Sequence, residues 1–184
     1  SRNKRILNSN NKTIFKDTKN KTLFNLEKFK FLIDDEILKG EKIIAVIDYD
    51  LPQSDKFFFE SSMFNLKNKT FVAKDVKVNF RKDMFDNIDN DPRLKGVSSS
   101  GKENITIVNK GVFTSCKEKD DCPPWAITAK KITHDKNKKT LTYDDAWLKI
   151  YNVPVLYFPK FFHPDPTVKR QSGLLRPQFN NSNS

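Results

Sequence analysis

Several features common in enzymes and in helical membrane proteins are scarce in this sequence. The 184 residues include only 5 glycines and 2 histidines, and no glycine-rich phosphate loop is present. No stretch approaches the ~18 consecutive apolar residues of a membrane-spanning helix. Neither His134 nor His163 has a serine or cysteine partner at a spacing typical of nucleophilic catalysis. The sequence therefore predicts no catalytic residues, no cofactor and no transmembrane helix.

Carboxylates and cysteines are also too few, or wrongly spaced, for the usual sites. The pairs at 34–35, 120–121 and 144–145 are adjacent aspartates, and neighbouring residues on a strand point to opposite faces, so they form no facing dyad. Cys116 and Cys122 are the only cysteines, and no further cysteine or nearby histidine pair completes a zinc site. No metal site is expected. A local disulfide, a disulfide to another domain and two free thiols all remain open.

The sequence is rich in phenylalanine and in positive charge. It has 16 phenylalanines and a formal net charge of +11, and so many aromatic residues argue against disorder. The charge favours an anionic partner such as nucleic acid, phosphorylated lipid or an acidic surface, or it simply covers solvated strand faces with lysine. No known nucleic-acid-binding motif is present. We therefore expect no nucleic acid partner, and a basic nucleic-acid-binding β module is kept as an alternative.

Apolar and polar residues alternate along much of the chain, and the alternation repeats. The stretch 31–43 overlays 64–76 at a spacing of 33 residues, and 64–76 overlays 132–146 at about twice that spacing. Each copy is a strand, a polar turn and a strand, which is typical of stacked units. The sequence therefore predicts an all-β domain. Residues 1–20 are expected to be an extended lead-in with one edge strand, and 81–101 a surface loop.

The alternation also predicts which side chains share an apolar face. Residues two apart on a strand lie on the same side, and stacked strands with one apolar side can enclose a lipid-binding interior. Burying an alkyl chain contributes about 0.8 kcal/mol per methylene, although the same side chains could instead fill the interior themselves. Nine of them are predicted to contact lipid: Phe31, Ile33, Phe64, Leu66, Phe71, Val76, Val78, Leu148 and Ile150.

The segment 147–179 differs from everything before it. It contains prolines at 154, 159, 164 and 166, many aromatic residues, the basic pair 169–170 and a new apolar start after Ser172-Gly173. Because proline lacks an amide donor and fixes φ, we expect no helix or central strand here. The predicted organisation is a β domain over 1–152, a proline-rich linker over 153–171, and the first residues of a further module over 172–184. Both ends are expected to be cuts in a longer protein.

This junction resembles the LptD family of lipopolysaccharide-assembly proteins, also called organic solvent tolerance proteins. The matching residues are Val153, Pro154, Val155, Tyr157 and Pro159, the basic pair, and 172–175. The resemblance implies an OstA-like periplasmic β-jellyroll of antiparallel strands that precedes an outer-membrane β-barrel, with 172–184 opening its first strand. It also implies lipopolysaccharide transport without a covalent step, at the periplasmic face of the outer membrane.

The same resemblance implies partners and a role for one cysteine. The implied partners are lipopolysaccharide, a periplasmic bridge protein at the N-terminal edge, and a plug lipoprotein held by the barrel. Cys116 is placed like the family's jellyroll cysteine, which bonds to a cysteine in the barrel, whereas Cys122 departs from that pattern. We expect at least one disulfide, since the implied compartment is oxidising. A soluble bridge protein of the same transport system is an alternative.

Overall fold

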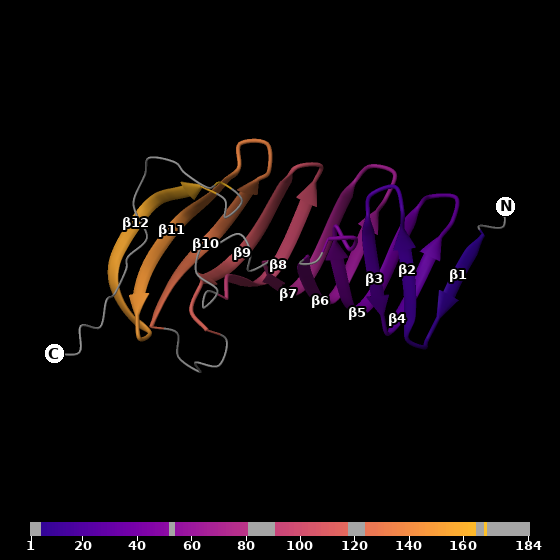
Figure 1. Ribbon diagram of the computed structural model, residues 1–184, viewed down its shortest axis with the longest axis horizontal. Coiled ribbons are helices and arrows are strands. Elements are labelled where there is room, and N and C mark those ends of the chain that lie inside the picture. Colours follow the sequence, from indigo (N-terminus) through magenta and orange to yellow (C-terminus); the bar gives the residue numbers. More distant parts are fainter. Residues whose placement is uncertain (1–4, 52–53, 81–90, 118–123, 165–167, 169–184) are drawn as a thin grey trace.

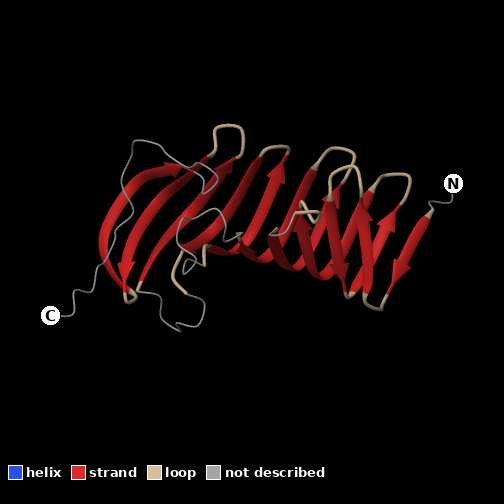
Figure 2. Ribbon diagram, viewed as in Figure 1, coloured by secondary structure: helices blue, strands red, loops and turns tan. Residues whose placement is uncertain are grey.

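The computed structural model describes residues 5–51, 54–80, 91–117, 124–164 and 168. These residues form strands, turns and short connections and no helix (Figures 1 and 2), so none forms a helix able to cross a membrane. The prediction of an all-β jellyroll of antiparallel strands is confirmed. The strands are β1 (Ile6–Ser9), β2 (Thr13–Asp17), β3 (Thr22–Leu26), β4 (Lys28–Leu32), β5 (Ile37–Ile47), β6 (Asp55–Asn65), β7 (Thr70–Asn79), β8 (Arg93–Lys102), β9 (Ile105–Thr114), β10 (Trp125–Asp135), β11 (Thr140–Ile150) and β12 (Val153–Pro164).

All twelve strands belong to one sheet, and every pair in it is antiparallel. From β4 onward, each strand pairs with the strand that follows it in the sequence, as far as β12. At the N-terminal end of the sheet, the first half of β5 pairs with β4 and its second half pairs with β3. On their other sides, β4 pairs with β1 and β3 pairs with β2. The sheet therefore has two walls. Wall 1 carries β1 and β4, and wall 2 carries β2 and β3.

The two walls meet at a line of residues that the strand pairing skips. In β6 and β7, for example, the register passes from Phe59↔Val76 to Ser61↔Lys74. The skipped residues in β5, β7, β9 and β11 have φ near +50°, and such unpaired residues bend a strand. We call this set the corner residues, and most are charged and exposed: Glu27, Lys42, Glu60, Asp75, Val97, Lys110, Lys130, Asp145 and Pro159.

The corner explains the spacing of the buried residues, in which Ala73 is followed by Val76 and Tyr143 by Ala146. A single skipped residue shifts the alternation by one, so inward residues are three apart at that point. The positive-φ residues recur in the turns as well, at Glu36, Lys69, Glu103 and Lys139. The spacing of these positions is close to the repeat length seen in the sequence. The structure also contains a copy over β8 and β9 that the sequence comparison did not find.

Two predictions for polar segments are wrong. The first twenty residues hold two strands, β1 and β2, instead of one. The predicted surface loop over 81–101 contains strand β8 from Arg93 onward, and 81–90 lie outside the described residues. Glycine and serine made β8 look like a loop, but Gly96 faces a buried neighbour. A Cβ on Gly96 would lie 2.2 Å from Val108 Cγ1, so only glycine fits beside this side chain.

The segment 153–164, for which no helix or central strand was expected, forms a strand at one edge of the described sheet. These residues form β12, which pairs with β11 along its whole length. The prolines occupy tolerant positions: Pro159 is a corner residue, Pro154 lies beside a register shift, and Pro164 ends the strand. Within the described sheet β12 pairs on one side only, and proline is compatible with such an edge. Whether 153–171 also connects to a further module stays a prediction, and 172–184 lie outside the described residues.

Candidate lipid-binding site

Seven of the nine predicted lipid contacts lie on strands and face the interior of the roll. Val76 and Val78 are buried in β7, and Phe64 and Phe71 pair across β6 and β7 with their rings against the core. Phe31 packs on the same core from β4. In β11, half-buried Leu148 and Ile150 pair with Leu156 and Val153 of β12. Lipid contact at these positions stays a prediction.

The other two lie in turns. The chain turns directly after β4, so Ile33 does not continue the inward face and its side chain is 38% exposed. Leu66 begins the turn between β6 and β7, where its backbone N–H donates to the Glu36 carbonyl at 2.9 Å. The strict alternation placed both residues on the inward face because it was extended through the polar turn residues. Ile33 in particular is not an inward residue.

In the N-terminal half, phenylalanine rings connect the two walls through the interior. Phe15 of β2 contacts Phe31 of β4 with ring centroids 5.7 Å apart, and Phe24 of β3 contacts Phe64 at 5.2 Å. Tilted and edge-to-face pairs of this kind contribute about 0.5–1.5 kcal/mol each beyond area burial. We call these rings the phenylalanine cluster: Phe15, Phe24, Phe31, Phe57, Phe59, Phe64 and Phe71.

In the C-terminal half, the aromatic residues also carry polar atoms. Fully buried Tyr143 of β11 stacks on His163 of β12, with its hydroxyl 2.8 Å from Nε2. The other ring nitrogen, Nδ1, lies 2.6 Å from the Pro164 carbonyl oxygen. Because a carbonyl only accepts, Nδ1 donates to it, and when the ring is neutral Nε2 is the nitrogen that accepts from the Tyr143 hydroxyl. Burial raises the pKa of the Tyr143 hydroxyl far above its ordinary value.

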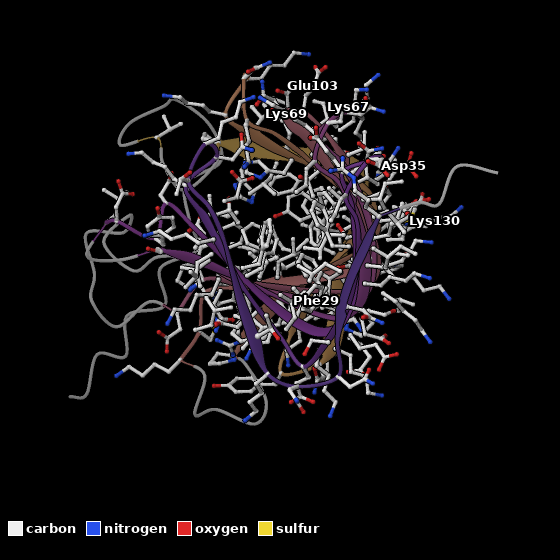
Figure 3. All side chains as sticks on the ribbon, turned by 90° about the vertical axis from the view of Figure 1, so that its right-hand side faces the viewer. Phe29, Asp35, Lys67, Lys69, Glu103 and Lys130 are labelled. Atoms are coloured by element: carbon white, nitrogen blue, oxygen red, sulfur yellow. The ribbon has the colours of Figure 1, made fainter. Side chains whose placement is uncertain are left out.

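Side chains of the described residues project into the interior, as seen along the roll in Figure 3. A small cavity of about 20 Å³ lies near the middle, between Val76 and Leu94 on one side and Thr106 and Lys136 on the other. That volume accommodates about one water molecule. The sequence left open whether the roll is filled or hollow. In this conformation the side chains of the described residues pack into the interior, so an alkyl chain enters only if side chains or walls move.

Sequence reasoning missed part of this interior. Phe57 and Phe59 lie in the run DKFFFESSMF, where consecutive apolar residues obscure the alternation. Phe158 and Phe161 were assigned to a linker and instead pack on the core from β12. Their inward position follows from the strand register, in which Phe161 pairs with buried Tyr143 and Phe158 pairs with buried Ala146. Only the paired structure supplies this register.

Cys116 is half-buried, with its Sγ 3.7 Å from the carbonyl oxygen of Trp125. Within the described residues it forms no disulfide, and Cys122 lies outside them. The nearby chain is held by buried Arg93, which donates to the carbonyls of Asp91, Cys116 and Lys117. The disulfide therefore stays a prediction. No group of histidine, cysteine, aspartate and glutamate in the described part of the chain is arranged to hold a metal ion.

Comparison with known proteins gives several LPS-assembly proteins as relatives. A segment of 96 residues is 32% identical to the LPS-assembly protein LptD of Pasteurella multocida, and 162 residues are 29% identical to that of Polaromonas sp.. A further 72-residue match, to LptD of Xanthomonas oryzae pv. oryzae, is 40% identical. This chain resembles LptD. The result confirms the resemblance drawn from the sequence, and no family model matches the chain.

The LptD matches cover this chain more fully than they cover the relatives. They include 52%, 80% and 39% of the chain in the three cases. The same matches span only 12%, 19% and 8% of the respective LptD proteins. The similarity is therefore to a small part of a longer protein, and it agrees with the all-β roll described above.

Proposed function

We propose that this chain acts in lipopolysaccharide assembly at the outer membrane, receiving the acyl chains of lipopolysaccharide in its interior. The observation that carries the proposal is a continuous apolar core, running from the phenylalanine cluster to Tyr143, Ala146 and Phe161, in a chain with LptD proteins among its relatives. Binding is noncovalent. The lipid then passes from this roll to a barrel that follows it in the full-length protein.

The filled interior requires the roll to open during lipid entry. Backbone hydrogen bonds connect neighbouring turns along each wall, such as Glu36 with Leu66 on wall 1 and Lys21 with Tyr49 on wall 2. Among the described residues, no backbone hydrogen bond joins the turns of one wall to those of the other. Separating the walls there breaks side-chain contacts only. An alkyl chain of about ten methylenes contributes roughly 8 kcal/mol, enough to offset several aromatic contacts.

The ends of the sheet suit the predicted neighbours. In the described sheet, β1 and β2 each pair on one side only, and Ile6, Leu7 and Ile14 are exposed there. An unpaired strand edge accepts a further strand, so this edge receives the periplasmic bridge protein. The edge at β12 faces the barrel, whose plug lipoprotein contacts this chain only through the barrel. The chain thus lies at the periplasmic face of the outer membrane.

Adjacent residues on β6 test the acyl-binding interior. Phe64 faces inward, whereas Met63 is exposed. We replace each in turn by the photoreactive residue benzoylphenylalanine in the full-length protein and irradiate cells. Position 64 is expected to crosslink lipopolysaccharide and position 63 is not. Equal labelling of both positions, or labelling of 63 alone, would contradict the proposal.

A further inference from the structure

Three lysine-rich turns lie side by side along the end of wall 1. We call residues 66–69, 102–104 and 136–139 the lysine rim, which contains six lysines and one glutamate. Backbone hydrogen bonds hold the turns together, because Glu103 N–H donates to the Lys69 carbonyl at 3.0 Å and Lys136 N–H to the Asn104 carbonyl at 2.9 Å. The rim is therefore a fixed row of cations instead of three independent loops.

An open depression of about 750 Å³ lies between the first two turns. Figure 3 shows Lys67, Lys69 and Glu103 together at the top of the view. The lining offers three ammonium groups, two side-chain amides and a hydroxyl, against a single carboxylate. These are the donors that bind phosphate oxygens. The lining residues are Lys67, Asn68, Lys69, Thr70, Lys102, Glu103 and Asn104.

The charge of the lysine rim is not neutralised locally. Lys67, Lys69 and Lys102 are exposed and form no ion pair within the described residues. Among the residues that the structure describes, Lys138 is the lysine of the third turn that approaches a carboxylate, at 3.9 Å from Asp135. The equivalent turn between β4 and β5 has the opposite sign, with three consecutive acidic residues at 34–36. Positive charge on this side of the roll thus begins at the turn between β6 and β7.

The lysine rim also borders the apolar interior. Lys136, in the third turn, lines the small central cavity together with Val76 and Leu141. In the first turn, Thr70 of the depression is followed by Phe71, whose ring packs on the core. A cationic surface and an apolar space are therefore a few residues apart. This arrangement matches an amphiphile with an anionic head and alkyl chains.

We propose that the lysine rim binds the phosphate groups of the lipid headgroup while the acyl chains occupy the interior. This inference rests on the proposed function and adds a headgroup site to it. A nucleic acid is disfavoured as the ligand, because the three turns contain no aromatic residue and base stacking is what holds single strands on such surfaces. Phosphorylated lipid is distinguished from free phosphate by its additional need for the interior.

The test compares a rim variant with a matched surface variant. The rim variant carries Lys67→Gln, Lys69→Asn and Lys102→Gln, with asparagine chosen because Lys69 has φ of 51°. The control carries Lys39→Gln, Lys74→Gln and Lys95→Gln, which remove three exposed strand lysines. Circular dichroism melts verify that both fold. Binding of lipopolysaccharide before and after phosphatase treatment is measured for the full-length protein at low and high salt.

We expect the rim variant to bind intact lipopolysaccharide about tenfold more weakly at low salt, since each exposed ion pair contributes about 0.2–1 kcal/mol. High salt should reduce that difference. Phosphatase treatment should weaken binding to the wild type and the control but leave the rim variant unchanged. Equal binding of intact and dephosphorylated lipid by the wild type would overturn the headgroup site while leaving the interior proposal standing.

Further arms identify other sources of anion binding. The inference would be overturned if pyrophosphate binds the wild type more tightly than the rim variant while phosphatase treatment of lipopolysaccharide changes binding to neither. That result would show a general anion site. Single-stranded DNA that binds more tightly than lipopolysaccharide, and loses affinity in the rim variant, would also overturn the inference. A wild type that binds neither form of lipopolysaccharide, with no crosslink at position 64, would reject the proposed function itself.

Discussion

The two halves of the roll fill their interiors differently. In the N-terminal half, the phenylalanine cluster brings the walls together with rings that carry no polar atom. In the C-terminal half, Tyr143 and His163 stack and hydrogen bond, and His163 also contacts Phe113 of the opposite wall at 5.6 Å. Hydrocarbon contacts are non-directional, whereas a hydrogen bond fixes position. An alkyl chain can therefore displace phenylalanine rings without leaving a buried polar group unpaired, which is not so at Tyr143.

The largest effect should come from removing a ring in the N-terminal half. Phe59 is buried and contacts Phe57, Phe64 and Phe71, so Phe59→Ala should lower the free energy of unfolding by about 3–5 kcal/mol. Urea titration followed by circular dichroism measures it. Met63→Ala, on the exposed face of the same strand, is the control and should cost below about 1 kcal/mol. Similar losses at both positions would show that the cluster is not the centre of packing in this half.

Adding one methyl group near the boundary between the halves should have the next largest effect. Gly96→Ala places a Cβ 2.2 Å from Cγ1 of Val108, whose side chain is buried. Overpacking of this kind costs about 1–3 kcal/mol. The double variant Gly96→Ala with Val108→Ala should be less destabilised than the sum of its two single variants, as a double-mutant cycle in urea would detect. Additive losses would contradict the close approach.

The hydrogen bond between Tyr143 and His163 sharpens the comparison in the C-terminal half. Tyr143→Phe keeps the ring and removes the hydroxyl, which should cost about 1–2 kcal/mol because a buried hydrogen bond to Nε2 of His163 is lost. Tyr157→Phe, which removes an exposed hydroxyl bonded to Asp145, should cost less. Equal losses would show that burial does not distinguish the two hydroxyls.

The raised pKa of Tyr143 adds a pH dependence to the same pair of proteins. Above the ordinary tyrosine pKa near 10, the unfolded chain loses this proton while the folded chain keeps it. The stabilising contribution is thus complete below about pH 10 and falls as pH rises, by up to about 1.4 kcal/mol per pH unit. Tyr143→Phe should show a shallower alkaline decline in urea titrations between pH 9 and 11. Identical slopes would contradict a neutral buried hydroxyl.

The smallest effect concerns the corner, which both halves share. Lys110 has φ of 49°, a conformation that β-branched residues resist, so Lys110→Val should destabilise by about 1 kcal/mol. Lys110→Gly should be neutral or slightly stabilising, since glycine adopts this backbone freely. Thermal melts of the two variants give the order. A valine variant as stable as the glycine variant would show that the corner is not held in the left-handed region.

The inward face was readable from the sequence at Phe64, Phe71, Val76 and Val78, because a strand with one buried side alternates with a period of two. Strand β8 was not readable, because its glycines 96 and 101 lie where a Cβ would clash with Val108 and Phe71 of the neighbouring strands. The strand over 153–164 was not readable for a related reason, as proline is excluded from a strand only where an amide donor is needed. In β12, the corner and the unpaired edge remove that need.

By itself, the amino-acid sequence determined the all-β class, the repeat and most of the apolar face, since these depend on the local alternation of side chains. The tertiary structure alone decided that the interior is filled, that the strands bend at one shared corner, and that three lysine-rich turns form a single rim. Each of these depends on which strands lie next to one another. Contacts between residues distant in the chain set that arrangement, and no local pattern encodes them.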